Sequence, residues 1–299
     1  MSNKGPLVSI LVNCYNGEKF LSGALESIIS QTYSNWEVIF WDNQSSDKSA
    51  EIFKGYVDPR FRYFCSPKHT KLYEARGMAF KHVRGRLLAF LDVDDIWSPD
   101  KLFRQVPLFE DPEVGMCCGN FMVENQNTNK SWEYFKSTRP SGYVLDELLK
   151  DFYVGLLTLM VRVDAIKGFD PIFDPRYHII GDFDLVFKLA HEWKLGCLQQ
   201  VVACYRIHGA NETSLRSQLQ VEELDSWLKD VEERSEITSS KNFCYAKSRI
   251  AYISGIHYVL AGERTKALNF LSKIKGIKSK LRLIFGVIVP RNIAKSLKN

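Results

Sequence analysis

Three carboxylates follow one apolar stretch of the sequence. In RLLAFLDVDD, residues 86–95, five uncharged residues precede Asp92, Asp94 and Asp95. Carboxylates this close in sequence repel one another unless a positive charge lies among them. In an extended chain Asp92 and Asp94 point to one side, which suits a divalent cation with oxygen ligands, such as Mg²⁺ or Mn²⁺. The alternative is a solvated acidic loop in which Asp95 caps the next helix.

The segments around these carboxylates alternate between strand and helix patterns. Strands that are apolar throughout and separated by helices indicate an α/β fold with a mostly parallel sheet that is covered by helices. Ligands bind such sheets beyond the carboxyl ends of the strands, where Asp92 stands. Ser98 and Pro99 have the pattern of a helix N-terminus. We expect strands at residues 7–13, 36–42, 60–66 and 86–92, and helices at residues 18–31, 47–57, 72–84 and 98–109.

The pattern changes after the first hundred residues. Strands are expected at residues 114–124, 158–166 and 197–209, and a helix at residues 181–194. From Ser214 the pattern is helical as far as Gly276. We therefore expect two domains, residues 1–215 with the sheet and residues 216–299 as a helical, basic C-terminal extension.

The composition is that of a soluble globular protein. Of the 299 residues 45% are hydrophobic and 25% are charged. The seven cysteines form no CxxC pair and no metal-ligand spacing, which favours free thiols in a reducing compartment. The N-terminal region lacks a signal-peptide pattern, and no stretch approaches the ~20 apolar residues of a transmembrane helix. The chain is expected to be cytoplasmic.

The positive charge is concentrated near the C-terminus. Residues 261–299 contain ten Lys or Arg and one acid, Glu263, a net charge of +9, whereas the whole chain has +5. Together with the apolar LIFGVIV at residues 283–289, this charge suits an anionic membrane surface. The alternative is a basic helix packed on the domain. No nucleic-acid recognition module is found, so nucleic acid is not expected as a partner.

Six motifs occur in an order that is specific to one protein family. Together they resemble the family 2 glycosyltransferases over residues 5–214. The resemblance implies the GT-A fold and an inverting enzyme that moves a sugar from a nucleotide diphosphate sugar, mostly with Mg²⁺ or Mn²⁺. Many members build bacterial surface polysaccharides, such as O-antigen. The motifs are NCYNGEKFLSGALESI (13–28), WDNQSSD (41–47), LYEARGMAFKHVRGRLLAFLDVDDIWSPDKL (72–102), VRVDAIKGFD (161–170), GDFDLVFKLA (181–190) and YRIHGANETS (205–214).

The resemblance also assigns catalytic and metal-binding roles. Asp182 matches the general base, which inverting transfer requires on the face opposite the leaving diphosphate. Asp184 is expected to be structural, and Gly181 stands where the family usually has Glu. The expected metal ligands are Asp94, Asp92 and His208, with Arg206, Asn211 and Ser214 as weaker companions.

A nucleotide pocket is implied around the ends of the first strands. Asp42 is expected near the base, Arg76 near the pyrophosphate and Asp92 toward the ribose. Alternatives are that Asn16 is a plain turn residue and that Asp47 caps a helix. The expected nucleotide-binding residues are Asn13, Tyr15, Asn16, Glu18, Asp42, Lys71, Arg76 and Asp92.

The resemblance implies a glycosyltransferase with UDP as the favoured nucleotide, because UDP is the commonest in the family. The acceptor is expected to be a lipid-linked saccharide or a polysaccharide, and the enzyme peripheral on the inner face of the cell membrane. One alternative is a sugar nucleotidyltransferase, although the Gly-rich, Arg-containing loop of that class does not follow the first strand. Another is a noncatalytic binding or scaffold protein on the same fold. A dinucleotide-dependent dehydrogenase is disfavoured because no GxGxxG follows the first strand.

Overall fold

The computed structural model describes residues 5–233, 235–290 and 294, which form two compact units. The first unit runs to Asn211 but omits Leu145–Phe152, and that segment belongs with the residues from Glu212 onward. Lys295, Lys298 and Arg291 of the basic tail lie outside the described residues. The domain limits expected from the sequence, residues 1–215 and 216–299, stay a prediction.

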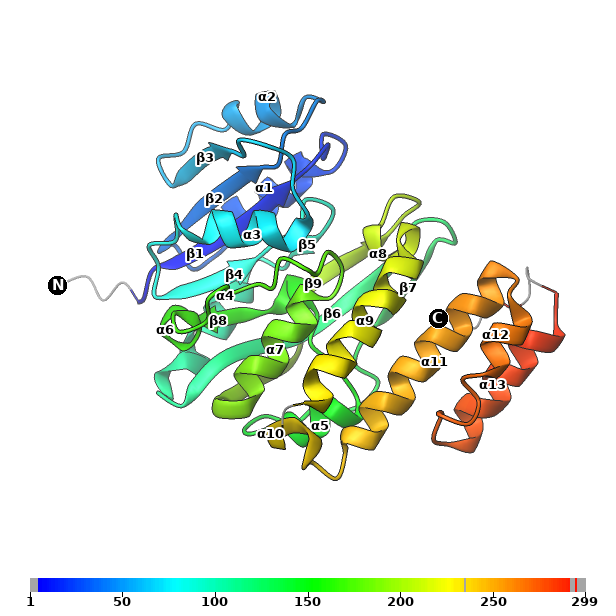
Figure 1. Ribbon diagram of the computed structural model, residues 1–299. Coiled ribbons are helices and arrows are strands. Elements are labelled where there is room, and N and C mark those ends of the chain that lie inside the picture. Colours follow the sequence, from blue (N-terminus) through cyan, green and yellow to red (C-terminus); the bar gives the residue numbers. More distant parts are fainter. Residues whose placement is uncertain (1–4, 234, 291–293, 295–299) are drawn as a thin grey trace. The chain divides into compact units, whose positions relative to one another are not determined.

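Nine strands of the described residues form one sheet in the first unit (Figure 1). Its order is β3–β2–β1–β4–β8–β6–β9–β5, and β7 pairs with β6. Parallel pairing joins the first four strands of this order, β3, β2, β1 and β4, whereas β8 is antiparallel to both β4 and β6. The strands are β1 (Val8–Cys14), β2 (Trp36–Asp42), β3 (Phe61–Cys65), β4 (Leu87–Phe90), β5 (Ile96–Trp97), β6 (Val114–Asn125), β7 (Lys130–Glu133), β8 (Met160–Arg162) and β9 (Lys194–Ile207).

Helices lie between most of these strands, which confirms the expected α/β class. They are α1 (Leu21–Ile29), α2 (Ser49–Lys54), α3 (Leu72–Phe80), α4 (Lys101–Gln105), α6 (Val163–Ile166) and α7 (Gly181–Glu192), with 3₁₀ turns at Val106–Glu110 and Leu156–Thr158.

Two expected element limits are wrong. Helix α4 begins after Asp100, and Ser98 does not cap it, because the Ser98 carbonyl accepts the Lys101 N–H in a preceding turn. The strand expected at residues 158–166 ends at Arg162 and continues as α6. The ladder between β8 and β4 ends where Arg162 pairs with Leu87, and the next residue, Val163, donates its N–H to the Arg86 carbonyl at 3.0 Å and begins α6.

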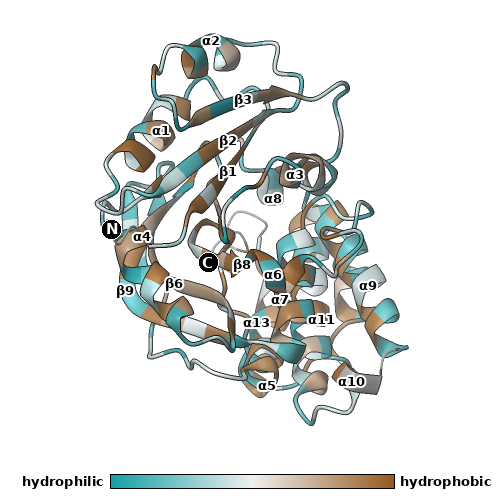
Figure 2. Ribbon diagram, turned by 90° about the vertical axis from the view of Figure 1, so that its left-hand side faces the viewer, coloured by the Kyte–Doolittle hydropathy of each residue, from teal (hydrophilic) through white to brown (hydrophobic). Residues whose placement is uncertain are grey.

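Strand β1 is buried along its whole length because both of its faces are covered. Val8, Ile10 and Val12 lie in one buried cluster with Leu25 of α1. Leu11, on the opposite face, is also buried, and α3 packs beside β1 and β2. Figure 2 shows β1 as hydrophobic along most of its length. Burial on both faces explains why this strand lacks the polar alternation of an exposed sheet.

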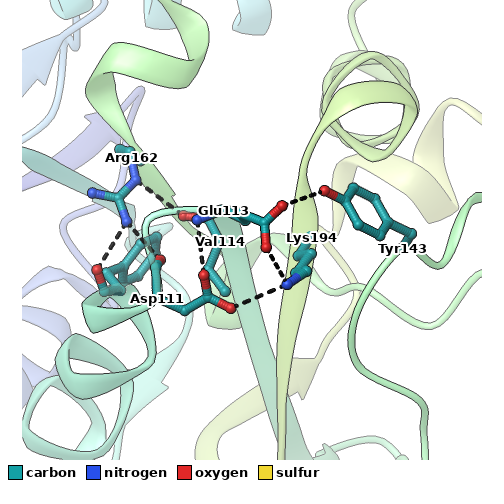
Figure 3. A network of polar contacts seen from close by, with 7 residues as sticks. Asp111, Glu113, Val114, Tyr143, Arg162 and Lys194 are labelled. Carbon is teal, nitrogen blue, oxygen red and sulfur yellow. Dashed lines mark hydrogen bonds and ion pairs between the residues drawn. The ribbon is translucent and has the colours of Figure 1, made fainter.

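A polar network holds the start of β6 beside the start of β9 (Figure 3). The Lys194 ammonium lies 2.5 Å from Glu113 Oε2 and 3.4 Å from Asp111 Oδ2. The Tyr143 hydroxyl donates to Glu113, and Arg162 donates to the Asp111 carbonyl. These groups lie at the surface, where solvent screens each pair, but together they hold the starts of the two parallel strands side by side.

The second unit is helical in the part of the chain that is described, as expected for the C-terminal extension. Its core contains Ile256, Ala267, Ile274 and Leu283. None of its described helices, nor any of the first unit, is both long and apolar enough to span a membrane. The helices are α5 (Leu145–Lys150), α8 (Glu212–Leu215), α9 (Ser217–Glu232), α10 (Ser235–Thr238), α11 (Phe243–Ala261), α12 (Arg264–Leu268) and α13 (Ile277–Ile288).

Candidate active site

The three carboxylates after β4 lie in a turn and have different partners. The Asp95 N–H donates to the Asp92 carbonyl at 3.0 Å, so the extended chain assumed for Asp92 and Asp94 is wrong. Asp95 is 4% exposed, and burial raises its pKa well above the usual range. It accepts the backbone N–H of Arg206 and precedes the strand β5, so it does not cap a helix.

Asp94 is paired with His208. The distance from His208 Nε2 to Asp94 Oδ2 is 3.0 Å. His208 Nδ1 accepts the Ala210 N–H at 3.2 Å, which leaves Nε2 as the ring nitrogen that faces Asp94. The ring of Phe20 stacks on the imidazole at 4.5 Å. Burial and the charge of Asp92 raise the pKa of Asp94, while its hydrogen bond with His208 opposes the rise.

Asn211 completes the surroundings of Asp94. Its side-chain Oδ1 accepts the backbone N–H of His208. Its Nδ2 donates to Asp94 Oδ2 at 3.5 Å and to the Arg206 carbonyl at 3.0 Å. Arg206 in turn donates to the Asp94 carbonyl. Of the weaker companions expected from the sequence, Arg206 and Asn211 therefore hold the segment after β9 against the turn after β4.

Asp92 is paired with a buried arginine of α3. Arg76 Nη2 contacts Asp92 Oδ1, and the Arg76 side chain is 1% exposed whereas that of Asp92 is 35% exposed. Arg76 Nη1 is buried and has no hydrogen-bond partner in the described part of the chain. An unpaired buried donor is costly, so this nitrogen is available to donate a hydrogen bond to a further anionic partner.

Asp182 lies in the first turn of α7, near a second residue of α3. The ring of Tyr73 lies against Gly181, the residue that precedes Asp182. Burial raises the pKa of Asp182, while the nearby Tyr73 and the charge of Arg76 oppose the rise. Asp184 is buried and lies 2.6 Å from Lys188 Nζ, one turn along α7. Tyr73 and Arg76 are three residues apart and share one face of α3.

The strand ends of β1 and β2 present the groups expected to bind a nucleotide. Asn13 is 7% exposed, and its Oδ1 has no partner among the described residues. Tyr15 is 51% exposed, with its ring 4.2 Å from that of His69. Asp42 is buried, and accepts the Tyr63 hydroxyl at 2.7 Å and the Ser45 N–H at 2.8 Å.

The loop residues between them have structural contacts. Asn16 has a left-handed φ of 52° and accepts the Ser46 N–H at 2.8 Å, which favours the alternative that it is a turn residue. Glu18 accepts the Lys48 N–H at 2.9 Å. Asp47 accepts the N–H of Ser49, the first residue of α2, as expected of a capping group. These contacts fix the loop that follows β1.

Lys71, directly before α3, is held by the segment before α7. Its ammonium donates to the Arg176 carbonyl at 3.1 Å, and the Leu72 N–H donates to His178 Nδ1 at 3.0 Å. The start of α3 is thereby attached to the chain that leads into Asp182. A role for Lys71 toward a nucleotide stays a prediction.

The donor set partly fits a divalent metal. No group of three or more His, Cys, Asp or Glu with metal-binding geometry occurs in the described ranges. Asp94 and His208 nevertheless lie side by side, and the raised pKa of Asp94 indicates a carboxylate that a cation would stabilise. Mg²⁺ commonly takes one or two protein carboxylates and completes its shell with water and phosphate.

Tyr73 and Phe20 were missed in the sequence analysis. Both are single aromatic residues within helical patterns, and such residues are usually part of the core. Tyr73 stands three residues before Arg76 in the helix that contains EARG. That spacing was visible, but only the fold shows that Asp182 lies beside it.

Comparisons with known proteins agree with this geometry. Residues 9–167, more than half of the chain, match the model of "Glycosyl transferase family 2". One relative is the Escherichia coli UDP-Glc:alpha-D-GlcNAc-diphosphoundecaprenol beta-1,3-glucosyltransferase WfgD, 32% identical over 163 residues. The match covers 54% of this chain and 63% of that protein, less than two thirds of its length.

Two solved structures share the fold. S. aureus TarS 1–349 in complex with UDP-GlcNAc superposes with a TM-score of 0.60 at 15% identity, covering 88% of each chain. A mannosyltransferase from Pyrobaculum calidifontis, in complex with GDP-Man and Mn²⁺, superposes with a TM-score of 0.62 at 15% identity, covering 99% of this chain and 86% of that one. At this identity the likeness shows the fold alone, which confirms the GT-A architecture.

Proposed function

This chain belongs to glycosyl transferase family 2 and is a glycosyltransferase, and on that premise we propose the reaction that it carries out. It moves a sugar from a UDP-sugar to a hydroxyl group of a lipid-linked saccharide or a polysaccharide, with inversion at the anomeric carbon. One observation carries the proposal: on one face of α3, Arg76 contacts Asp92 and the Tyr73 ring lies against Gly181, the residue before Asp182. The carboxylate expected to act on the acceptor thus lies near the one expected to hold the donor.

Asp182 acts as the general base. It takes the proton of the acceptor hydroxyl as that oxygen attacks the anomeric carbon opposite the departing diphosphate. Burial raises the pKa of Asp182, and a general base is most effective when its pKa approaches the working pH. Arg76 supplies positive charge to both Asp182 and Asp92, which limits the repulsion between these carboxylates.

Asp94 and His208 would hold a Mg²⁺ or Mn²⁺ ion, with Asp92 nearby. Carboxylate oxygens suit both ions, and imidazole nitrogen is a further donor for a transition metal. Such an ion would supply positive charge against the negative charge that develops on the departing diphosphate. The Pyrobaculum calidifontis mannosyltransferase, whose complex contains GDP-Man and Mn²⁺, supports this assignment.

UDP and a lipid-linked acceptor are supported by the named relatives. The Escherichia coli protein is named for UDP-Glc as donor and for a GlcNAc-diphosphoundecaprenol acceptor, and TarS is described in complex with UDP-GlcNAc. A lipid-linked acceptor requires the enzyme to work at a membrane surface. We place that surface at the inner face of the cell membrane.

A donor screen tests the proposed reaction. The purified chain is incubated with UDP-glucose, UDP-GlcNAc, GDP-mannose and other nucleotide sugars, with Mn²⁺ or with EDTA, and released nucleoside diphosphate is measured. Water replaces the acceptor in this assay. We expect slow release of UDP from a UDP-sugar that depends on Mn²⁺. Release from a GDP-sugar alone would contradict the choice of UDP, and full release in EDTA would contradict the metal.

Helix α13 provides the surface through which the protein meets the membrane. Five apolar side chains of this helix are exposed, with exposed fractions from 36% to 76%. They are spaced so that, at 3.6 residues per turn, they occupy one face of about 100°. The opposite face carries Leu283 and Gly286, which are buried in the helical unit. The exposed residues, defined here as the α13 stripe, are Ile277, Leu281, Ile284, Phe285 and Ile288.

Basic residues flank the α13 stripe, and this charge selects an anionic lipid surface as its partner. Lys278 and Arg282 lie on one side of the stripe and Lys280 on the other, and no acidic residue occurs between Arg264 and Asn299. Each basic residue near an anionic surface adds ~1 kcal/mol, and each buried Leu, Ile or Phe side chain adds ~1.5–3 kcal/mol. A stripe of this kind lies in the plane of the interface.

Vesicle sedimentation distinguishes this surface from other uses of the stripe. We expect the full chain to sediment with phosphatidylglycerol vesicles and the Leu281→Glu, Phe285→Glu double variant to remain in solution. Leu215→Glu in α8 is the matched control, because Leu215 is 64% exposed and lies outside the stripe. If the double variant sediments as the wild type does but loses self-association, the stripe joins two copies of the chain and the membrane assignment is wrong.

A further inference from the structure

Two cysteines that the proposed reaction does not use face each other across neighbouring strands. Cys118 of β6 pairs in register with Cys197 of β9, in a parallel part of the sheet. Their sulfur atoms are 3.7 Å apart. In the part of the chain that the structure describes, none of the other five cysteines has a hydrogen bond to a second sulfur atom. Cys118 and Cys197 are therefore a pair that a single bond can join.

The backbone spacing of the two cysteines suits a disulfide. Neighbouring strands lie about 4.7–4.9 Å apart, and a disulfide joins residues whose Cα atoms are about 4.4–6.8 Å apart. An S–S bond is about 2.05 Å long, so the two sulfur atoms must approach each other by about 1.7 Å. The ladder is irregular directly after the pair, where Gln199 and Gln200 of β9 are left out of the register. Such a bulge disrupts the ladder locally, which allows the small change in twist that the bond requires.

The two thiols differ in their surroundings. Cys118 is 0% exposed, whereas Cys197 is partly exposed. The hydrogen bond from Cys118 lowers the pKa of Cys197 and raises that of Cys118. The backbone of Cys197 is fixed, because its N–H donates to Ser141 Oγ at 2.9 Å and its carbonyl accepts Gln199 Nε2 at 3.2 Å. Cys197 is therefore the thiol of the pair that a small solute can reach, and the one more easily present as a thiolate.

We propose that Cys118 and Cys197 are a peroxide-sensitive pair of thiols, which oxidation joins in a disulfide between β6 and β9. The Cys197 thiolate attacks one oxygen of hydrogen peroxide, the O–O bond breaks, and the other oxygen leaves as hydroxide and takes up a proton to become water. Cys197 is then a sulfenic acid. This modification site is separate from the proposed function and does not rest on it.

The second step closes the bond. The Cys118 sulfur attacks the Cys197 sulfur, the S–O bond breaks, and the hydroxyl group leaves with the Cys118 proton as water. Two thiols are thereby oxidised by two electrons in all, and one peroxide is reduced to two molecules of water. Disulfides of this kind in reducing compartments are usually transient, so the bond is expected only after exposure to the oxidant.

Peptide mapping of the oxidised full chain tests the bond. The protein is treated with hydrogen peroxide, its remaining thiols are alkylated, and it is digested with trypsin. Trypsin leaves Cys118 in the peptide of residues 105–130 and Cys197 in that of residues 195–206. We expect the two peptides joined, lighter by two hydrogen atoms than the pair of free peptides, with fragments that place the bond between Cys118 and Cys197. Dithiothreitol should separate them.

Each peptide contains a second cysteine, which supplies a matched control. Cys117 precedes Cys118 and points to the opposite face of β6, and Cys204 lies further along β9. Cys118→Ala and Cys197→Ala should each abolish the joined peptide, whereas Cys117→Ala and Cys204→Ala should retain it. Dimedone, which labels sulfenic acids, should label Cys197 in Cys118→Ala and leave Cys118 unlabelled in Cys197→Ala.

The wild-type digest alone can overturn the inference, so the test does not depend on the folding of any variant. Peptides 105–130 and 195–206 that stay separate, at a peroxide concentration that oxidises the exposed Cys65, would contradict the bond. Fragments that place the bond at Cys117 or Cys204 would contradict the pairing. Dimedone on Cys118 but not on Cys197 would contradict the assignment of the attacked thiol.

Discussion

Lys101 should make the stability of the first unit depend on pH. Its side chain is 0% exposed, donates to Gln105 Oε1 at 2.6 Å and lies 4.1 Å from the Trp97 ring. No ion pair joins it among the residues described. Burial lowers the pKa of Lys101 from 10.5 to about 7, so the unfolded chain binds more protons than the folded one between these values, and stability rises with pH across that window.

The magnitude follows from the same two values. A difference of about 3.5 pH units at 1.36 kcal/mol per unit means that the buried amine costs about 5 kcal/mol at pH 7 and nothing above pH ~10.5. Lys101→Met removes this cost but leaves Gln105 without its donor, a loss of ~1–3 kcal/mol. We therefore expect the variant to be more stable than the wild type by about 2–4 kcal/mol at pH 7. At pH 9 the remaining cost of the amine, about 2 kcal/mol, is offset by the loss at Gln105, so the two proteins should have about equal stability.

Urea denaturation at pH 7 and pH 9, followed by tryptophan fluorescence, measures both effects. The comparison of wild type with Lys101→Met cancels the other groups that titrate in this range. If the variant is less stable than the wild type by the same amount at both pH values, Lys101 keeps its charge when folded. The reasoning from burial would then be refuted.

Three further predictions concern the site and the membrane surface. Asp94→Asn should lower donor turnover by ~10²–10³-fold and weaken its response to Mn²⁺, because one electrostatic stabiliser is lost; wild-type turnover in the variant would contradict the metal role. Arg76→Met should destabilise the first unit by ~3 kcal/mol, since Asp92 loses its buried partner, and urea denaturation that shows no change would exclude this pairing. Vesicle binding should weaken at ~1 M salt, where exposed charges more than ~3 Å apart are largely screened from one another. Binding that is insensitive to salt would leave no role for the basic residues.

The parallel half of the sheet was predictable because its signals are local. The strands around Val8, Val38 and Leu88 are mostly apolar and buried, and each is followed by a helical pattern. The element limits that were wrong depend on contacts between segments. Strand β8 ends at Arg162, opposite the first residue of β4, and no periodicity within residues 158–166 reports that.

The sequence predicted which residues belong to the site, but not which of them contact one another. The motifs indicated Asp92, Asp94, Asp182 and His208, whereas the turn after β4 decides which carboxylate meets which partner. Tyr73 has no signal of its own in the sequence, because a buried aromatic residue in a helix is usually core. Its contact with Gly181 depends on α3 and the start of α7 being neighbours, which is a property of the fold.

The most direct test of the central claim compares Asp182→Asn with Asp184→Asn. Both substitutions remove one carboxylate from the first turn of α7, and Asp184 pairs with Lys188. Donor affinity is measured by calorimetry and donor turnover by release of UDP. We predict that Asp182→Asn binds the donor as the wild type does while turnover falls by ~10²–10⁴-fold, and that Asp184→Asn mainly lowers stability. Normal turnover in Asp182→Asn, or loss of donor binding alone, would contradict its role as the general base.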